Sequence, residues 1–594
     1  MGEKQELALE NSFSRRAFMQ GALATATAGV LAAMSSRQQA YADEGSPEAA
    51  PESDKGYSWD NPPEPVAESD IVETIDCEIL VVGAGVAGMA GIMYGAAQGA
   101  NVHVLEKGPM EGVHRLSVAG INSEYNKQLM PENSVDPEEF TRDFIRSSGA
   151  MQSKTPIVSR YAKDSGKFID WLVGAMAPYG WSLLPCRMSK IDEGYSWPDY
   201  ETFHFFMDDQ GNNVATGTSP NWMKLFRQIA EDNHATFHFN EPAFYLEREE
   251  GERGRVTGAI SHNALTGEYR RYNASKGVLL AAGDFYNNKE MVHKFGPHLE
   301  RCVSSICEPN NTGDMHMAGH WVGAAMDDYT AGDLFGFQNA PCKNYVGPVE
   351  GEEGYVPMMD CLRATMWAPA MAGYPMLWVD DGGRRFVNED MNNFQQAGAQ
   401  MILTTPTGLA WTIFDGAWES KMPENWQTDC PGGILIGVQS ATNQTQIDKE
   451  VEEGLIQKYD TLEALAEGCG FDVDTFMETV NRYNYLCEQG RDEDCYKAKK
   501  WLTSLDTPPY YAAHWGAMIT STRCGLKTDE HSHVLDTASH VIPGLYAAGN
   551  NGGNFYGLNY PGTFGGTGIG HGQFYSWTAV RDMLGEDVIY NSER

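Results

Sequence analysis

The sequence lacks the cysteine patterns that hold redox metals. None of its eleven cysteines forms a CxxC pair, and CxxCH, the attachment motif of c-type haem, is absent. No group of cysteines and histidines has the spacing of a zinc or iron–sulfur site, so no metal site is expected. Cys302 and Cys307 are the nearest pair, and we interpret them as free or buried thiols.

Positive charge is also scarce. The 594 residues include 43 lysines and arginines against 81 aspartates and glutamates, which gives a formal net charge of −38. This excess argues against nucleic acid or an anionic membrane surface as a partner, and it would suit a basic electron-transfer partner. The length, with 42% apolar residues, predicts more than one domain.

The apolar stretch 21–34 is too short, and too rich in alanine, glycine and threonine, to span a bilayer. It follows Arg15-Arg16 and precedes Ala40-Tyr41-Ala42, an A-x-A cleavage pattern. Residues 1–42 therefore resemble a twin-arginine signal peptide, which predicts export across the cytoplasmic membrane to the periplasm or cell surface. The alternative is a disordered tail with a chance Arg-Arg pair. Residues 43–71 are acidic and rich in proline and serine, which is typical of a linker.

A dinucleotide-binding pattern follows the linker. Residues 79–82 are apolar and β-branched, as in a buried parallel strand, and they lead into Gly83, Gly85 and Gly88. The first glycine permits a tight turn, the second lets backbone N–H groups approach a pyrophosphate, and the third lets a helix pack closely on the strand. That helix is expected over 89–98, with its positive end toward the phosphates.

A second strand is expected over 101–105, ending at Glu106, where a carboxylate should accept hydrogen bonds from ribose hydroxyls. This pattern alone does not separate FAD from NAD. The predicted export favours FAD, because an exported protein has no nicotinamide pool. A further buried strand at 276–282, ending in the turn at Gly283, also favours FAD, as does a helix expected from about Gly565 through Met583, whose positive end could face the flavin.

Together with Tyr560-Pro561-Gly562, these segments resemble the FAD-binding family that contains fumarate reductase and succinate dehydrogenase flavoproteins, urocanate reductase and 3-ketosteroid Δ1-dehydrogenase. The resemblance runs from about Glu73 to the end, and it includes Thr312-Gly313-Asp314 and the segments 383–389, 479–484 and 508–511. It implies bound FAD. The cofactor-binding residues expected from these motifs are Gly83, Gly85, Gly88, Glu106, Lys107, Gly120, Gly283, Asp314, Gly549, Asn550, Gly566 and Thr567.

The chain departs from the fumarate reductases at the groups that hold the dicarboxylate. Where that branch has a histidine before a Gly-Gly pair, residues 520–525 contain none, and Tyr560 stands in place of an arginine. The proton-relay pattern Asn-Glu-x-x-Arg is broken, since Asp390, Met391 and Asn392 follow Glu389. We therefore expect fumarate to bind poorly.

The match to the steroid dehydrogenases is better at these positions. Like them, the chain has Ala-Ala-Gly-Asn at 547–550, Tyr-Pro-Gly at 560–562 and Gly-Gly-Thr at 565–567. The resemblance implies that the Tyr560 hydroxyl and the Gly565 N–H polarise a ketone oxygen; alternatively, Tyr560 only packs beneath the flavin. Arg523 is a candidate for substrate binding or proton transfer, or else a structural ion-pair residue. Arg385 and Glu389 are candidates on the cap side, or they only fix the hinge.

The expected fold is α/β, with a discontinuous Rossmann-like FAD-binding domain (72–325 and 506–594) and an inserted α+β cap domain (326–505). Helices at 460–466 and 474–480 are expected in the cap. The leading hypothesis is an exported FAD-dependent oxidoreductase that acts on CH–CH bonds and reduces an activated C=C bond of an enone or enoate. Its electrons would come from a separate donor, such as a quinol-linked cytochrome. Alternatives are a 3-ketosteroid Δ1-dehydrogenase-like dehydrogenase, a non-catalytic flavin electron carrier and an oxidase.

Overall fold

The computed structural model describes residues 56–112, 117–131, 134–149, 152–186, 203–213, 220–251, 254–305, 307–308, 310–339, 371–372, 374–390, 394–424, 426, 443–561 and 564–586. The segment from Ser58 onward forms one compact unit. The predicted signal peptide and most of the predicted linker lie outside the described residues, so both stay predictions.

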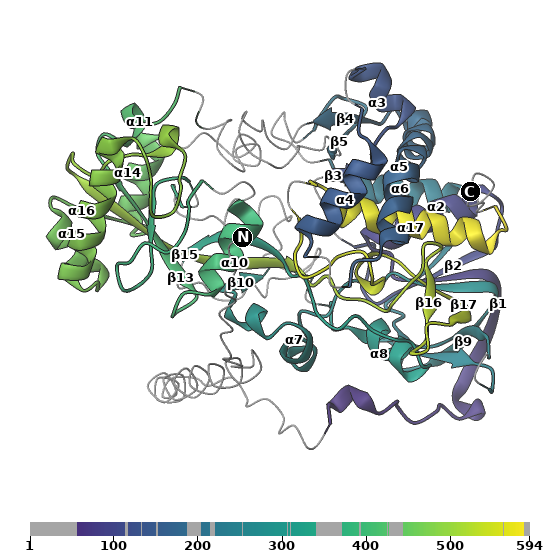
Figure 1. Cartoon of the computed structure of the whole chain (residues 1–594). Helices are drawn as coiled ribbons and strands as arrows, with labels where there is room; N and C mark the ends of the chain where they lie inside the picture. Colours follow the sequence, from purple (N-terminus) through teal and green to yellow (C-terminus); the bar gives the residue numbers. More distant parts are fainter. Residues whose placement is uncertain are drawn as a thin grey trace, which may run out of the picture. The chain divides into compact units, whose positions relative to one another are not determined.

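The larger sheet has eight strands in the order β16-β17-β9-β1-β2-β6, with β8 beside β9 and β7 beside β8 (Figure 1). β1 (Ile71–Val82) pairs in parallel with both β2 (Val102–Glu106) and β9 (Tyr269–Leu280). The remaining strands are β6 (Thr236–Phe239), β7 (Ala243–Arg248), β8 (Val256–His262), β16 (His533–Leu535) and β17 (Val541–Ala547). The parallel core, with Leu80, Val278 and Leu545 fully buried, confirms the Rossmann-like fold class.

Early and late segments of the described chain meet at β9. Val278 lies in register with Leu80 of β1 on one side and with Leu545 of β17 on the other. Helix α2 (Val86–Ala97) leaves β1, as predicted, and packs on α17 (Thr567–Met583), the helix predicted near the C-terminus (Figure 1). Gly91 N donates to Ser576 Oγ across 3.0 Å, a contact that only a glycine allows because a Cβ there would lie 2.6 Å from that oxygen.

The second sheet forms the cap. Its six strands are β10 (Ser304–Ser305), β11 (Asp333–Asn339), β12 (Leu377–Val379), β13 (Leu409–Asp415), β14 (Ile456–Tyr459) and β15 (Tyr510–Ser521). β15 pairs with β10, β11, β13 and β14, so the cap sheet includes residues on both sides of the expected boundaries at 325/326 and 505/506. The α+β character of the cap is thus present, and its central strand comes from the segment that we assigned to the second part of the FAD-binding domain.

Two cap helices were predicted. α15 (Leu462–Cys469) begins after Thr461, whose side chain accepts from Ala464 N, and α16 (Val473–Gln489) begins after Asp472, whose side chain accepts from Thr475 N. Both helices are confirmed, and each has a side-chain N-cap. The other α-helices of the described residues are α3 (Glu124–Leu129), α4 (Pro137–Ser147), α5 (Thr155–Met176), α6 (Trp222–Asp232), α7 (Lys289–Phe295), α8 (Asp314–Trp321), α10 (Phe394–Leu403), α11 (Trp418–Lys421) and α14 (Gln444–Glu452).

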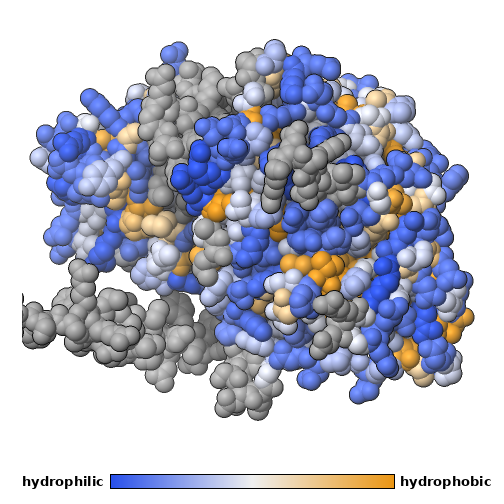
Figure 2. All heavy atoms as spheres, turned by 45° about the vertical axis from the view of Figure 1, so that its right-hand side comes forward, coloured by the Kyte–Doolittle hydropathy of each residue, from blue (hydrophilic) through white to orange (hydrophobic). Residues whose placement is uncertain are grey.

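A small antiparallel sheet joins β3 (Ser117–Ala119), β5 (Phe203–Met207) and β4 (Ser182–Cys186). Figure 2 shows a mostly hydrophilic face, in keeping with the excess of acidic residues. Cys302 and Cys307 are both buried thiols, as expected. Within the described part of the chain, no helix combines the length and apolar character needed to cross a bilayer.

The glycine turn gives a matched pair of variants. A Cβ on Gly88 would lie 2.1 Å from Gly83 O, whereas a Cβ on Gly85 meets nothing within 4 Å. Gly88→Ala should therefore destabilise the flavin-free protein by about 1–3 kcal/mol. Gly85→Val should leave that stability within about 0.5 kcal/mol and should instead abolish FAD retention, because its side chain fills the space expected for the phosphates. Thermal unfolding of the flavin-free protein and the flavin released on denaturation measure the two effects. Equal destabilisation by both variants would contradict this account of the turn.

His533 gives a pH-dependent prediction. Its Nδ1 lies 2.9 Å from Asp529 Oδ2 and its Nε2 lies 2.9 Å from Asp582 Oδ2, so the charged ring joins β16 to α17. Burial lowers the pKa of His533, but the hydrogen bonds to the two carboxylates outweigh this and raise the pKa to about 10. The stabilisation is therefore complete below the unfolded pKa of about 6.5 and is lost as the pH rises toward 10.

We expect His533→Gln to lower the free energy of unfolding by about 1–3 kcal/mol at pH 6. The difference from wild type should shrink as the pH approaches 10. Denaturant unfolding at a series of pH values tests this. His540→Gln is the matched control, because its side chain is 62% exposed beside Asp536. A His533 deficit that does not change with pH would show that the ring is not charged in the folded protein.

Candidate functional site

The turn after β1 leaves space at the positive end of α2. Gly83 has φ +107°, and a Cβ there would lie 2.4 Å from Ala281 O, so the close approach of β9 requires glycine. Gly85 is the N-cap of α2 and faces open space. Backbone N–H groups at the start of α2 thus border a cradle that a side chain at Gly85 would fill. This geometry fits the pyrophosphate of a dinucleotide.

Glu106 ends β2 beside this turn. Its carboxylate accepts from Ala84 N at 2.8 Å and from Gly108 N at 2.7 Å, and burial raises its pKa. The carboxylate therefore fixes the glycine turn, a role that the sequence did not reveal. Since each carboxylate oxygen has further lone pairs, Glu106 can still accept from ribose hydroxyls, as predicted.

Lys107 and Asp314, which we predicted from separate motifs, lie together. Lys107 Nζ is 2.9 Å from Asp314 Oδ2 and donates to Thr312 Oγ1 at 2.8 Å. The Thr-Gly-Asp motif thus begins α8 next to the end of β2. The structure thus brings these two predicted residues together, and their contact with the cofactor stays a prediction.

The segment 549–551 comes from the other end of the chain and meets the same turn. Gly549 has φ +63°, and a Cβ there would lie 2.6 Å from Cβ of Ala87 in the first turn of α2. Asn551 Oδ1 accepts from Ala282 N at 2.5 Å. Next to Ala282, a Cβ on Gly283 would lie 2.5 Å from Asn311 Oδ1. The predicted glycines 83, 85, 283 and 549 therefore line segments that converge.

His316 is a buried residue that the sequence analysis missed. Its Nε2 donates to the carbonyls of Cys524 and Asn550 at 3.0 and 2.9 Å, and its Nδ1 lies 3.1 Å from Asn551 Nδ2. Burial lowers the pKa of His316 to about 4, so the ring is neutral at neutral pH. It positions the 549–551 segment. The only sequence cue was its place two residues after Asp314, in the motif that the family resemblance already covered.

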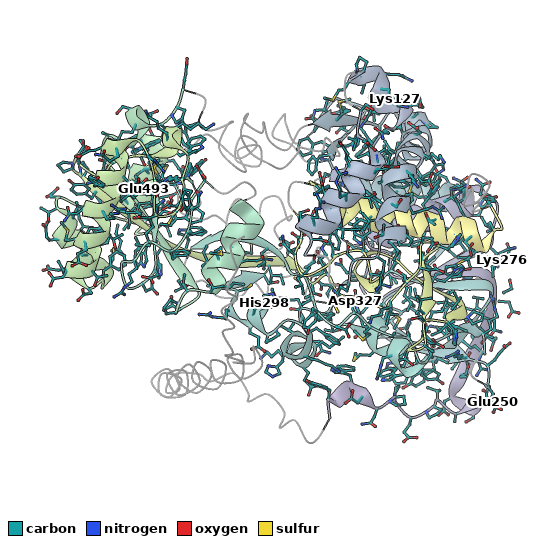
Figure 3. The ribbon with its side chains drawn as sticks, in the orientation of Figure 1. Lys127, Glu250, Lys276, His298, Asp327 and Glu493 are labelled. Carbon is teal, nitrogen blue, oxygen red and sulfur yellow. The ribbon has the colours of Figure 1, made fainter. Side chains whose placement is uncertain are left out.

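Asp327 was also missed (Figure 3). Its carboxylate accepts from Gly525 N at 3.3 Å and from Asn554 N at 3.2 Å, and burial raises its pKa to about 7. Asp327 thus ties the loop after β15 to the loop after 549–551. Asp327 and its neighbour Asp328 belong to no motif that indicated this contact.

The start of α17 is tightly enclosed. Gly566, its N-cap, has φ +74°, and a Cβ there would lie 2.7 Å from the Phe203 ring. Thr567 begins the helix and is fully buried. Gly120 lies after β3, where a Cβ would meet Ile169 of α5 at 2.5 Å. This packing explains why residue 120 is a glycine, and a direct contact of Gly120 with the cofactor stays a prediction.

Tyr560 lies at the positive end of α17. Its hydroxyl oxygen accepts from Gly568 N at 3.2 Å, and its side chain is buried. Burial raises the pKa of Tyr560 to about 12, which Asp333 reinforces and Arg523 opposes. The phenol therefore keeps its proton at neutral pH and can donate it in a hydrogen bond. Gly565 is buried just before the helix, while Gly562 of the Tyr-Pro-Gly motif lies outside the described residues.

Arg523 connects three segments around Tyr560. Its Nη2 lies 2.5 Å from Asp333 Oδ2, and its Nη1 donates to Asn550 Oδ1 at 2.7 Å and to Gly568 O at 3.1 Å. The buried ion pair that the sequence analysis offered as one interpretation of Arg523 is thus present. Sequence gave no indication of its partner, Asp333, which begins β11.

Arg385 and Glu389 lie in a different cluster. Arg385 forms two hydrogen bonds to Glu389, of 2.8 and 2.7 Å, and one of 2.7 Å to Asp492; Lys497 Nζ is 3.6 Å from Glu389. All four residues belong to the segment 326–505; Glu389, Asp492 and Lys497 are buried, and the Arg385 side chain is 8% exposed. The structure therefore brings these two candidates together with each other, and their described contacts do not include Tyr560 or Arg523. A catalytic role for them stays a prediction, as does the alternative of a hinge support. Met391 and Asn392 are not among the described residues.

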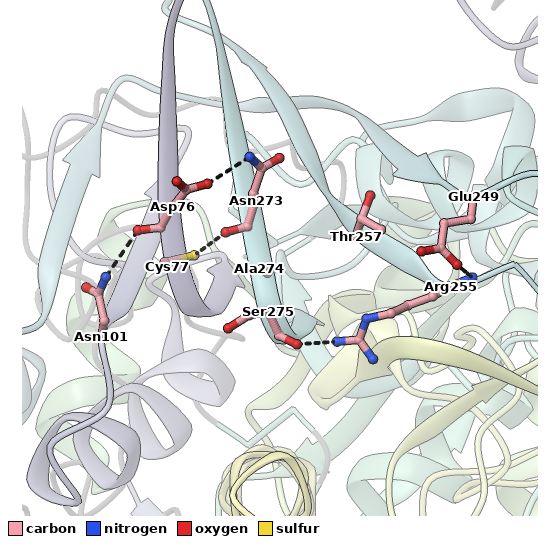
Figure 4. A pocket seen from close by; sticks show the side chains of 9 residues that line it. All are labelled: Asp76, Cys77, Asn101, Glu249, Arg255, Thr257, Asn273, Ala274 and Ser275. Carbon is pink, nitrogen blue, oxygen red and sulfur yellow. Dashed lines mark hydrogen bonds between the residues drawn. The ribbon is translucent and has the colours of Figure 1, made fainter.

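A surface pocket of about 530 Å³ lies elsewhere on the large sheet (Figure 4). It is lined by Asp76, Cys77, Asn101, Glu249, Arg255, Thr257, Asn273, Ala274 and Ser275. None of the predicted site residues lines it. Its polar groups bond to one another, for instance Asn273 Nδ2 to Asp76 Oδ1 at 2.8 Å and Arg255 Nη2 to Ser275 O at 3.0 Å.

Comparisons with known proteins agree with this geometry. Vinyl phenol reductase of Lactiplantibacillus plantarum is 26% identical over 500 residues, which cover 82% of this chain and 92% of that protein. Urocanate reductase of Eggerthella lenta is 25% identical over 519 residues, 85% and 74% of the two chains. A solved structure of 3-ketosteroid Δ1-dehydrogenase from Sterolibacterium denitrificans, with 1,4-androstadiene-3,17-dione, matches with a TM-score of 0.62 and 20% identity over 86% of this chain and 99% of that one.

The solved structure shows a shared fold. A family model described as an FAD binding domain matches residues 78–566, the greater part of the chain. That range includes the glycine turn, Glu106, the 549–551 segment and Tyr560. The chain therefore belongs to this FAD-binding family and is an FAD-dependent oxidoreductase.

Proposed function

We propose that this FAD-dependent oxidoreductase, which acts on CH–CH bonds, reduces an activated C=C bond in an enone or enoate. The observation that carries the proposal is the place of Tyr560, with its hydroxyl at the positive end of α17 and its ring beside the Arg523 guanidinium. The named activities of two relatives, vinyl phenol reductase and urocanate reductase, support a reductase. FAD, when bound, supplies the hydride for the carbon β to the activating group.

Tyr560 stabilises the oxygen of the activating group. Because its pKa is raised to about 12, the phenol donates a hydrogen bond that strengthens as negative charge moves onto that oxygen. Gly565 N–H is the second donor by resemblance to the steroid dehydrogenases. Burial opposes the charge of Arg523, but Asp333 outweighs this and raises the guanidinium pKa further above its usual range. Arg523 is therefore a hydrogen-bond donor, and the proton for the α carbon comes from another acid.

The electrons come from a separate donor in this proposal. The chain has no CxxCH motif, and its net charge of −38 suits a basic partner such as a quinol-linked cytochrome. Export by the twin-arginine route, supported by Arg15-Arg16 and the A-x-A pattern at 40–42, would place the enzyme beside such a donor.

The second candidate is the reverse reaction, dehydrogenation of a ketosteroid-like substrate. It is favoured by Tyr560 and Gly565, which match the ketone-polarising pair of that branch. Both reactions use the same hydrogen-bond donors to the substrate oxygen. The direction therefore follows from the electron donors and acceptors that the protein meets. A non-catalytic flavin carrier would have neither activity.

Tyr560→Phe tests the proposed role of the hydroxyl. The ring is retained, so the fold and FAD content should survive, whereas reoxidation of the reduced enzyme by the best alkene should slow by about 10²–10³-fold. The loss should fall on turnover more than on KM, because the hydrogen bond is strongest in the transition state. The measurement is anaerobic stopped-flow reoxidation with enones, acrylates, fumarate and quinones.

Tyr556→Phe is the matched control. Tyr556 is buried beside Tyr560, and its hydroxyl contacts Thr567 Oγ1 at 3.3 Å. It should keep most of the activity. A flavin-loaded Tyr560→Phe protein that reoxidises at the wild-type rate would show that Tyr560 only packs. We expect fumarate to be a poor electron acceptor in this panel. If fumarate is the best acceptor, other cationic residues must bind its carboxylates.

Export gives a separate prediction. Replacing Arg15 and Arg16 by lysine keeps the charge but removes the arginine pair that the export route recognises. The double variant should accumulate in the cytoplasm with its FAD bound. Cell fractionation measures this, and the single variant Arg37→Lys, outside the pair, is the control. Normal export of the double variant would rule out the twin-arginine route.

A further inference from the structure

Arg523 brings a positive charge next to Tyr560. Its guanidinium carbon lies 5.3 Å from the centre of the Tyr560 ring and 5.6 Å from that of Tyr556. A free guanidinium at this place would favour an anionic substrate, because arginine binds carboxylates with two parallel hydrogen bonds. Whether the charge is free decides what kind of oxygen the site prefers.

This guanidinium already forms an ion pair with Asp333. The 2.5 Å contact joins side chains that are 8% and 11% exposed, so the pair is shielded from water and has no net charge. Nη1 is held by Asn550 Oδ1 and Gly568 O. Arg523 could bind a carboxylate with two parallel hydrogen bonds only by giving up partners that it already has, which would leave Asp333 as an uncompensated buried charge.

Two donors at the end of β15 have no partner among the described residues. Arg523 Nε and the Ser521 hydroxyl are both buried and without a hydrogen bond. Buried polar groups rarely stay unpaired, so such donors mark a place where a bound molecule completes the hydrogen bonds. One N–H and one hydroxyl suit a neutral oxygen, but they do not balance a full negative charge.

We propose that Asp333 is a specificity-determining residue. By cancelling the charge of Arg523, it restricts the substrate to one whose activating group is a neutral carbonyl or phenol. This inference rests on the proposed reductase function and names its substrate class. Asp333 acts through Arg523, so it is a positioning residue. A carboxylate would lose its hydration on entering and find no free cation, whereas a neutral oxygen loses less and gains the donors of Tyr560 and Arg523.

The test compares an ester with its acid. Methyl cinnamate and cinnamate share the ring and the C=C bond and differ in charge. Anaerobic stopped-flow reoxidation of the reduced holoenzyme should be at least about tenfold faster with the ester. Asp333→Asn frees the guanidinium charge, and the ester preference should fall by about tenfold or invert. Arg523→Gln removes the guanidinium charge and keeps Asp333, so its preference for the ester should stay or rise.

Glu241→Gln is the matched control. Glu241 is buried and lies 3.1 Å from Arg270 in another ion pair on the large sheet, so this variant disturbs a buried pair away from Tyr560. Its ester-to-acid ratio should equal that of the wild type. A wild-type preference for the acid, or an unchanged ratio in flavin-loaded Asp333→Asn, would overturn the inference. If Asp333→Asn does not accumulate with flavin, Arg523→Gln decides, and a gain of preference for the acid in that variant would overturn it.

Binding separates this inference from the proposed reaction. The saturated pair, methyl 3-phenylpropionate and 3-phenylpropionate, cannot be reduced, and calorimetry with the oxidised holoenzyme measures their affinities. A shift toward the acid in Asp333→Asn, without any turnover of the unsaturated pair, would support the specificity and reject the reductase. Turnover without such a shift would do the reverse. If neither pair binds or reacts in any variant, both proposals fail.

Discussion

The close packing of α2 on α17 is the constraint on which the rest of the structure depends. The two helices carry the beginning and the end of the nucleotide region, and Gly91 and Gly95 of α2 lie against Ser576 and Val580 of α17. Cβ atoms on these glycines would lie 2.6 and 3.1 Å from their neighbours. Because the helices approach so closely, the turn at Gly83 and the segment 549–551 reach the same place beside β9. The site is a product of this contact.

The charged groups around Tyr560 are also closely packed, and each is held by partners from other segments. Arg523 is fixed by Asp333, Asn550 and Gly568, which belong to three different segments. His316 and Asp327 hold two neighbouring loops while both are buried, and burial shifts their pKa values toward the neutral forms. A neutral histidine, an aspartate with a raised pKa and a compensated arginine reduce the free charge around Tyr560. The polar chemistry there is carried by oriented hydrogen-bond donors.

Local patterns made most of the fold predictable from the sequence. The strand before Gly83, the helix after it, β2 and the capped helices α15 and α16 all follow from periodicity and capping, which act within a few residues. Asp333 could not be predicted, because its partner Arg523 is 190 positions away and neither residue lies in a recognisable pattern. The cap sheet differed from expectation for a similar reason. β15 pairs with strands that lie far from it in the sequence. A domain boundary placed at one position of the sequence cannot describe a sheet that takes strands from both sides of it.

The contact between Gly91 N and Ser576 Oγ joins residues 485 positions apart. Closing so long a loop of the chain is slow compared with local folding. During synthesis, this contact cannot form until α17 has left the ribosome. Until then, α2 and its phosphate cradle have an uncovered apolar face and no enclosing wall. A nascent or shortened chain without α17 therefore cannot retain the nucleotide. Tight cofactor retention therefore requires that translation has passed α17.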